Sequence, residues 1–337
     1  MEKKMKAIVA KSSSKTQDNG TFTLAEQPMP EPQEQDLLVK IVAIGMNPVD
    51  TKFRKRSGKD SVLGWDACGI VEKTGAGVSG FKAGDRVFYA GDITRPGCNS
   101  EYHLVDQRIA APAPAKLSPE DAAAMPLTSI TAWEGLFARL GFVAAAQANS
   151  GRSMLIIGGA GGVGSAAIQL ARWSGLTVYA TASRPETADW CRKLGAEVIL
   201  YHRNSLAEEL KAAGAETVDA IFCTTQMERH WQAMAECIRP QGSIVLIDDP
   251  VELLDITVFK RKSVKICWEF MYTRSMFQTD DVVEQGKLLA TVAGLLDEGV
   301  LVSTRQITLT GLTPENIQAM HVRQESGTMI GKQVLVL

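Results

Sequence analysis

The sequence has 337 residues, with 36 Lys and Arg side chains against 38 Asp and Glu side chains, for a net charge of −2. This balance excludes a strongly basic, nucleic-acid-binding protein, and without an apolar run of about 18 residues the chain is not expected to span a membrane. The hydrophobic share of 45% and the charged share of 22% exclude a disordered or fibrous chain. Six scattered cysteines without a Cys-x-x-Cys pair indicate a reducing, cytoplasmic compartment.

Short β signals dominate the chain up to about residue 125. Apolar and β-branched residues predict strands over 6–10, 36–44, 69–74 and 86–89, with glycine-containing turns at 75–77 and 84–85. Helical signal is sparse in this part. We expect an antiparallel, barrel-like β domain.

The pattern changes after residue 115. Ser118-Pro119 is a typical helix start, and 131–140 is predicted to be helical. Strands and helices then alternate, which predicts βαβ units and a parallel sheet. The expected strands are 154–157, 178–182, 197–200, 219–223, 243–247 and 264–268, with helices over 164–174, 186–194, 205–213 and 228–238. A long helix over 280–298 and a strand over 332–336 follow.

A glycine motif lies between the first strand and helix of this alternation. Residues 159–164 read Gly-Ala-Gly-Gly-Val-Gly and fit G-x-G-x-x-G. In a dinucleotide-binding turn, Gly159 permits the tight turn, Gly161 lets the backbone approach a pyrophosphate, and Gly164 lets helix and strand pack closely. Gly162 and Val163 lie just before the predicted helix, whose free N–H groups attract phosphate.

The end of the second strand predicts which dinucleotide binds. An NAD site needs an acidic residue there for the ribose hydroxyls, but the strand ends in Ser183-Arg184. The Arg184 guanidinium suits a 2′-phosphate, and Tyr201, after the next strand, can stack on adenine or donate to that phosphate. Glu186 follows Pro185 and begins the next helix instead. These residues predict NADP(H), with a solvated surface role for Arg184 as the alternative.

Several segments outside the glycine motif are characteristic of one enzyme superfamily. They are Met5–Val9, Asn47–Asp50, Gly64–Gly69 and Gly77–Val87. With the glycine motif, they make the chain resemble the medium-chain dehydrogenase/reductase superfamily and its quinone-oxidoreductase branch. Residues 89–93, 95–97, 126–134 and 268–271 resemble a bacterial subgroup called zinc-binding alcohol dehydrogenase family proteins. The resemblance implies a GroES-like catalytic domain (1–127), a Rossmann NADP-binding domain (128–270), a C-terminal return to the catalytic domain (271–337), and an active site between the two domains.

The subgroup's name implies a zinc site, but the residues at the ligand positions are not those of a typical zinc site. Asn47 stands where the alcohol dehydrogenases have the first cysteine ligand, and Trp65-Asp66 stands where they have His-Glu. Trp is not a ligand and Asn is a poor one for zinc. The region of the structural-zinc lobe has only Cys98. The histidines, His103, His202, His230 and His321, are far apart in sequence. We therefore predict no metal.

The resemblance also implies roles for single residues. Asn47, Asp66 and Tyr89 are the candidate catalytic residues; the alternatives are a helix-capping Asn47, a buried structural Asp66 and a packing role for Tyr89. Many relatives carry a tyrosine where this chain has Lys52, which removes one phenolic donor. The remaining candidate cofactor residues are Thr128, Thr131, Thr224, Ile247 and Lys332, the last because the family often has a basic residue there that reaches phosphate.

These expectations favour an NADPH-dependent, metal-free reductase of quinones or activated enones, acting by hydride transfer on a small molecule. Without a Lewis acid, simple ketones and alcohols are hard to polarise, whereas quinones and enones are already electrophilic. Two alternatives stay open: a zinc-type alcohol or aldehyde dehydrogenase, and a non-catalytic, crystallin-like NADPH-binding protein. The apolar strand 264–268 predicts a homodimer in which it pairs with its two-fold mate.

Overall fold

The computed structural model describes the chain except residues 1–2, 13–14, 17, 19–20 and 202. The chain divides into two compact units: a first unit of Met1–Ile130 with Tyr272–Leu337, and a second unit of Thr131–Met271. These junctions lie close to the domain boundaries expected after residues 127 and 270. No helix in the described residues is both long and apolar enough to cross a membrane.

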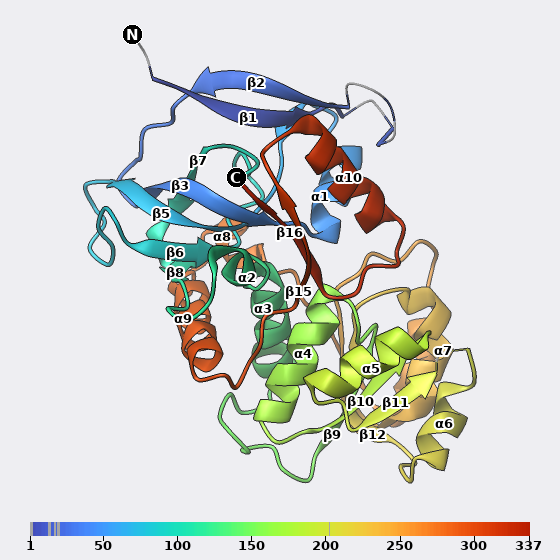
Figure 1. The fold of residues 1–337 in the computed structure, drawn as a ribbon. Helices are drawn as coiled ribbons and strands as arrows, with labels where there is room; N and C mark the ends of the chain where they lie inside the picture. Colours follow the sequence, from blue (N-terminus) through green and yellow to red (C-terminus); the bar gives the residue numbers. More distant parts are fainter. Residues whose placement is uncertain (1–2, 13–14, 17, 19–20, 202) are drawn as a thin grey trace. The chain divides into compact units, whose positions relative to one another are not determined.

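The first unit consists mainly of antiparallel sheet. Its larger sheet has seven strands within the described residues, in the order β15-β16-β3-β5-β6-β8, with β7 also paired to β3. Only the β15–β16 pair is parallel among these pairings. Figure 1 shows β16, near the C-terminus, beside β3, from the N-terminal part of the chain. The strands of this sheet are β3 (Asp36–Gly45), β5 (Asp66–Thr74), β6 (Arg86–Tyr89), β7 (Tyr102–Asp106), β8 (Ala110–Pro112), β15 (Arg305–Thr310) and β16 (Lys332–Val336).

A smaller sheet and several helices complete the first unit. The sheet has the order β2-β1-β4 and is antiparallel. Its strands are β1 (Lys4–Ala10), β2 (Phe22–Pro28) and β4 (Ser61–Val62). The helical segments are α1 (Pro48–Arg56), the 3-10 turn η1 (Gln107–Ile109), α2 (Pro119–Ala123), α8 (Thr273–Phe277), α9 (Val283–Asp297) and α10 (Pro314–Glu325). Helix α3 (Pro126–Trp133) begins in this unit and ends in the second.

Helix α1 was not foreseen, because we expected little helix before residue 125. Its sequence, PVDTKFRKR, has no clear apolar stripe, so periodicity gives no signal. Its ends nevertheless carry the usual marks: Pro48 at the first position, Asp50 in the first turn and basic residues in the last turn.

The second unit is the expected parallel α/β fold. Its sheet has the order β11-β10-β9-β12-β13-β14 in the described chain, and every pair is parallel. This is the strand order of a Rossmann fold. The strands are β9 (Ser153–Ile157), β10 (Thr177–Ala182), β11 (Val198–Tyr201), β12 (Val218–Cys223), β13 (Ile238–Leu246) and β14 (Lys265–Trp268).

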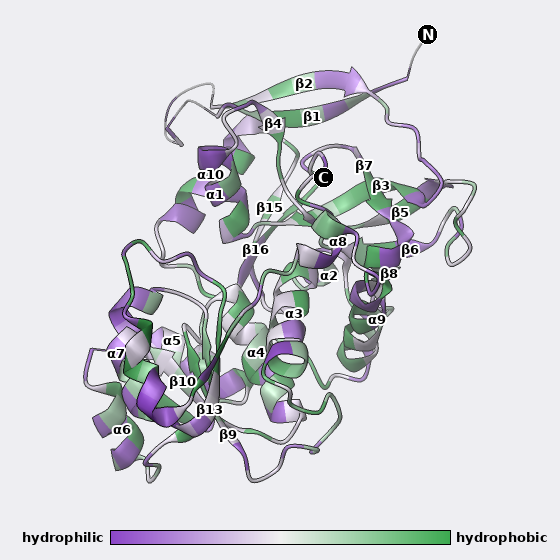
Figure 2. Ribbon diagram, turned by 180° about the vertical axis from the view of Figure 1, so that it is seen from behind, coloured by the Kyte–Doolittle hydropathy of each residue, from purple (hydrophilic) through white to green (hydrophobic). Residues whose placement is uncertain are grey.

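The helices of this unit bury their apolar faces against the sheet. Leu206 and Leu210 of α6, with Met227 and Met234 of α7, join a core cluster formed with the strands. Both helices show mixed apolar and polar colours in Figure 2, as expected for half-buried helices. The helical segments are the π-helical η2 (Glu134–Arg139), α4 (Gly162–Trp173), α5 (Pro185–Leu194), α6 (Leu206–Ala212), α7 (Met227–Cys237) and the 3-10 helix η3 (Ile256–Lys262).

Candidate functional site

The turn between β9 and α4 places the tight bend one residue earlier than expected. Gly158, not Gly159, has a positive φ of +84°. A Cβ on Gly158 would lie 2.4 Å from Thr224 Oγ1, and its N–H donates to Thr181 Oγ1 at 3.0 Å. Gly158 therefore meets the conformational demand that we had assigned to Gly159. The doubled glycine after the strand was the available signal, but it did not show which glycine makes the bend.

The other glycines of the motif divide into packed and open positions. A Cβ on Gly159 would lie 3.0 Å from Ala180 Cβ and Cys191 Sγ, and one on Gly164 would lie 2.2 Å from the Gly158 carbonyl oxygen. Gly161 is different, because among the described residues its Cβ would meet only the Gly158 carbonyl oxygen, at 3.5 Å. Gly161 is the N-cap of α4, and Gly162 and Val163, which follow it, are partly exposed. This open helix N-terminus has the character of an anion site.

The ends of β10 and β11 bring the predicted 2′-phosphate residues together. Ala182, the last residue of β10, lies opposite Tyr201, the last residue of β11. Ser183 and Arg184 therefore directly follow the residue that neighbours Tyr201, which belongs to its strand instead of following it. Thr187 Oγ1 accepts the N–H groups of Ser183 at 3.3 Å and Arg184 at 3.1 Å, which fixes the start of α5.

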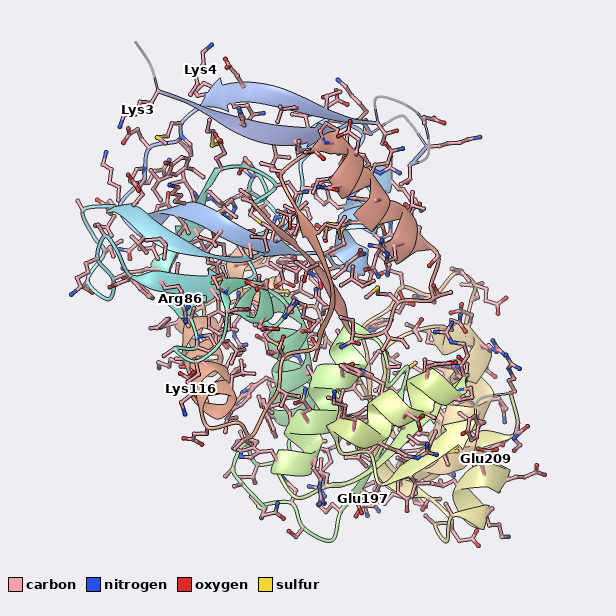
Figure 3. The ribbon with its side chains drawn as sticks, in the orientation of Figure 1. Lys3, Lys4, Arg86, Lys116, Glu197 and Glu209 are labelled. Atoms are coloured by element: carbon pink, nitrogen blue, oxygen red, sulfur yellow. The ribbon has the colours of Figure 1, made fainter. Side chains whose placement is uncertain are left out.

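Two acidic side chains near these strand ends lie away from the position of an NAD-type acid. Glu209 of α6, labelled in Figure 3, accepts the Tyr201 N–H. Glu186 is exposed in the first turn of α5, as expected. The end of β10 therefore carries Ser183 and Arg184 instead of an acid.

The remaining cofactor candidates lie where the chain order placed them. Thr224 follows β12 and donates its hydroxyl to the Ile157 carbonyl at 2.7 Å, and Ile247 follows β13. Thr128 is buried in the first unit, where its hydroxyl donates to the Met125 carbonyl at 3.2 Å. Thr131 is buried in the second unit. Contact of these side chains with a cofactor stays a prediction.

In the first unit, sheet register brings Asn47, Asp66 and Lys332 together. Strand β16 pairs with β3 so that Val334 lies opposite Gly45, and Gly45 lies opposite Asp66 of β5. Continuing the β16 register by two residues places Lys332 opposite Asn47. All three side chains are at most 3% exposed.

The Lys332 ammonium is the centre of this cluster. It donates to the Met46 carbonyl at 2.6 Å, to Asp66 Oδ2 at 2.9 Å and to Asn47 Oδ1. An ammonium has three hydrogens, so these acceptors use all of them. The structure thus gives Lys332 a different set of partners from the phosphate that we expected, and phosphate contact would require it to release one of these acceptors.

Both carboxylate oxygens of Asp66 also have protein partners. Oδ2 accepts from Lys332 and from Asn47 Nδ2 at 2.7 Å, and Oδ1 accepts the Leu127 N–H at 2.6 Å. Because Asn47 Oδ1 faces a donor and Nδ2 faces an acceptor, the orientation of its amide is determined. Hydrogen bonds in this cluster therefore link β5, β16 and Asn47, the N-cap residue of α1.

Asp50 is a neighbour that we did not single out. Its carboxylate accepts the Asn47 N–H at 2.7 Å and the Gly64 N–H at 3.0 Å. Burial raises its pKa to about 7, even though these bonds and the Lys332 charge oppose the shift. The spacing Asn-x-x-Asp, typical of a capping box, was the sequence signal for this residue.

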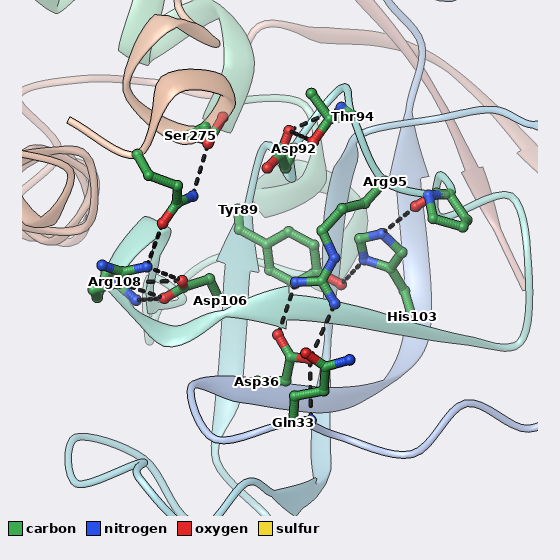
Figure 4. Close-up of polar contacts among 12 residues, drawn as sticks. Gln33, Asp36, Tyr89, Asp92, Thr94, Arg95, His103, Asp106, Arg108 and Ser275 are labelled. Atoms are coloured by element: carbon green, nitrogen blue, oxygen red, sulfur yellow. Dashed lines mark hydrogen bonds and ion pairs between the residues drawn. The ribbon is translucent and has the colours of Figure 1, made fainter.

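Tyr89 belongs to a separate hydrogen-bonded group. Its hydroxyl lies 3.0 Å from His103 Nδ1, and His103 Nε2 lies 3.0 Å from the Pro96 carbonyl oxygen (Figure 4). His103 therefore donates from Nε2 and accepts the tyrosine proton at Nδ1. Burial raises the pKa of Tyr89 well above its usual range and lowers that of His103 to about 4. This geometry favours the packing role of Tyr89 over the catalytic one.

The donor set does not fit zinc. Within the described residues, no group of three or more His, Cys, Asp or Glu side chains is placed to hold a metal ion. Trp65, at one former ligand position, is buried, donates to the Asp92 carbonyl at 3.0 Å and packs edge-on against Phe53. All six cysteines are free, and burial next to Asp50 and Asp66 raises the pKa of Cys98 well above its usual range. His202 lies outside the described residues.

Comparison with known proteins gives consistent matches. Family models described as "Alcohol dehydrogenase GroES-like domain" and "Zinc-binding dehydrogenase" match residues 33–115 and 162–284. A zinc-type alcohol dehydrogenase-like protein of Staphylococcus aureus is 40% identical over 98% of this chain and 99% of its own length. A crystal structure from Rhizobium etli, assigned as a zinc-dependent alcohol dehydrogenase, is 44% identical with a TM-score of 0.95 over 100% of this chain and 99% of that one. The Escherichia coli quinone oxidoreductase in complex with NADPH is 25% identical with a TM-score of 0.83, over 98% of this chain and 100% of that one.

Proposed function

The chain belongs to the medium-chain dehydrogenase/reductase superfamily of nicotinamide-dependent oxidoreductases, and on this premise we propose that it is an NADPH-dependent, metal-free reductase of quinones or activated enones. The observation that carries the proposal is the cluster of Asn47, Asp66 and Lys332. At two positions where the resemblance puts zinc ligands, Asn47 and Asp66 are bonded to an ammonium group. A substrate that needs no Lewis acid fits this site.

The nucleotide site supports NADPH as the cofactor. Bound NADPH supplies a hydride. The exposed N-terminus of α4, with the open position at Gly161, is suited to hold the pyrophosphate. Ser183 and Arg184 stand where an NAD enzyme has an acid, next to the partly exposed Tyr201. The chain's own contribution is to bind and orient the cofactor and to place polar groups near the acceptor.

A matched substrate panel tests the reaction. Purified protein, treated with a chelator and given NADPH, is assayed against 1,4-benzoquinone, an enone such as 3-buten-2-one, and its saturated counterpart butan-2-one. We expect turnover of the quinone or the enone and none of the saturated ketone. Alcohol oxidation that disappears with the chelator would establish the zinc-type alternative instead, and NADPH binding without any turnover would establish the non-catalytic one.

We also propose that the protein is a homodimer joined through β14. This strand ends the sheet, pairing with β13 through its register with Ser243–Leu246. Ile266 is only partly buried and Trp268 is 55% exposed, so the edge presents apolar surface. Sedimentation at micromolar concentration should give a dimer, and a monomer would refute this arrangement.

A further inference from the structure

The Lys332 ammonium is held in a way that resembles the coordination of a small cation. Its three acceptors are the main-chain carbonyl of Met46, the side-chain amide oxygen of Asn47 and a carboxylate oxygen of Asp66. Met46 and Asn47 follow β3, and Asp66 begins β5, so one point charge ties the ends of these strands to the start of β16. Lysine suits this task because its ammonium is a compact point charge.

The charges around Lys332 explain why the cation is needed. Asp66 is 0% exposed and Asp50 is 1% exposed. The Lys332 charge acts against the rise of the Asp50 pKa, while Asp66 adds to it. Tyr272 and Cys98 face the same carboxylates, and burial together with these charges raises the pKa of both groups, so both stay neutral. The positive charge of Lys332 therefore offsets the negative charge of Asp66. Without Lys332 the buried site would carry a net negative charge.

We propose that Lys332 is the resident cation of this site: its ammonium takes the place of a metal ion and acts as a positioning residue that fixes Asn47 and Asp66 for the reductase reaction. The catalytic part rests on the proposed function, whereas the resident cation does not. The structure carries the inference through the bonding of Lys332, because its three hydrogens are directed at Met46, Asn47 and Asp66.

Chemical rescue tests this role. Lys332→Ala removes the charged side chain, and Met46, Asn47 and Asp66 each lose one hydrogen-bond donor. We expect a lower melting temperature and a loss of kcat/KM for the quinone or enone of about tenfold or more. n-Propylammonium chloride should restore both in a saturable way, whereas sodium chloride and n-propanol should not. Lys332→Met, whose side chain fills the space, should resist rescue. Lys287→Ala, at an exposed position of α9, is the matched silent control.

A neutral double variant separates stability from positioning. In Lys332→Met/Asp66→Asn both members of the Lys332–Asp66 ion pair are replaced by neutral side chains, and the amide oxygen at position 66 still accepts the Leu127 N–H. We expect it to be more stable than Lys332→Met alone but still impaired in kcat/KM. If Lys332→Ala does not fold, the kcat/KM of this double variant still tests the positioning role. Full activity of the double variant would overturn the positioning role.

The cofactor affinity of these variants decides between the two roles of Lys332. A resident cation predicts an unchanged Kd for NADPH in Lys332→Met, because all three hydrogens of the ammonium are bonded to Met46, Asn47 and Asp66. A Kd weakened by about tenfold or more would overturn the proposal and establish the phosphate contact. If the wild type reduces none of the substrates, the reductase function fails, and the resident cation is judged by rescue of the melting temperature alone. Absence of that rescue refutes it.

Discussion

Gly161→Ala separates cofactor binding from folding more cleanly than any other change in the glycine motif. Within the part of the chain that the structure describes, a Cβ at this position meets only the Gly158 carbonyl oxygen, at an ordinary van der Waals distance of 3.5 Å. The backbone angles, φ −72° and ψ 173°, are comfortable for alanine. Alanine is a poorer N-cap than glycine. It also restricts the unfolded chain, which stabilises the folded state by about 0.4–1 kcal/mol. We expect these effects to offset one another, leaving the free energy of unfolding within about 1 kcal/mol of wild type.

The same methyl group would block the approach of a pyrophosphate to the helix N-terminus. If the phosphates are displaced, at least one hydrogen bond from a main-chain N–H to a charged oxygen is lost. Such a bond contributes about 1.5–3 kcal/mol, which corresponds to a Kd for NADPH weakened by roughly 10- to 150-fold. Titration of NADPH fluorescence measures this change, and thermal melting measures the stability.

Two other glycines provide the controls. Gly164→Ala should destabilise the unit, because its Cβ would lie 2.2 Å from the Gly158 carbonyl oxygen and 2.7 Å from Gly159 Cα. Gly294→Ala on α9 meets nothing within 4 Å and should be silent toward NADPH. Wild-type affinity for NADPH in Gly161→Ala would show that no pyrophosphate approaches this turn, and the reasoning would be wrong.

Three further predictions concern the cofactor, pH and metal. Arg184→Ala should weaken NADPH binding by about 1.5–3 kcal/mol and barely change NADH binding; equal wild-type affinity for the two cofactors would refute NADP preference. The ring of His321 lies 4.7 Å from that of Phe22 in a tilted arrangement, and burial, assisted by Arg54 and Lys55, lowers the pKa of His321 to about 3. Below about pH 6.5 the unfolded chain binds a proton on the His321 imidazole and the folded chain does not, so the free energy of unfolding falls as the pH falls. In His321→Phe the decrease in this free energy between pH 6.5 and 4.5 should be smaller by about 2–3 kcal/mol, measured by urea unfolding. Elemental analysis should give far less than one zinc per chain, and a chelator should leave reductase activity intact.

Local sequence was sufficient for the second unit. Its strands and helices alternate with clear periodicity, and the glycine motif is contiguous. Residues that are neighbours in the sequence therefore suffice to predict the parallel α/β fold and the turn after β9. Ser183 and Arg184 directly follow β10, as their place in the sequence indicates, and their contact with a 2′-phosphate stays a prediction. The exception is the bend at Gly158, because two adjacent glycines are equally permissive and only the packing against Thr224 selects one of them.

The site in the first unit depended on tertiary structure. Lys332 and Asn47 are 285 residues apart in the sequence, and no local pattern reveals that β16 pairs with β3 in the register that joins them. Sequence suggested a phosphate partner for Lys332, whereas register gave it Asp66 and Asn47. Tyr89 likewise looked available until the fold placed His103 against its hydroxyl. Sequence thus singled out Asn47, Asp66 and Lys332 as candidates and missed Asp50. Their bonding was decided by strand pairing, because hydrogen bonds between distant segments exist only once the sheet has formed.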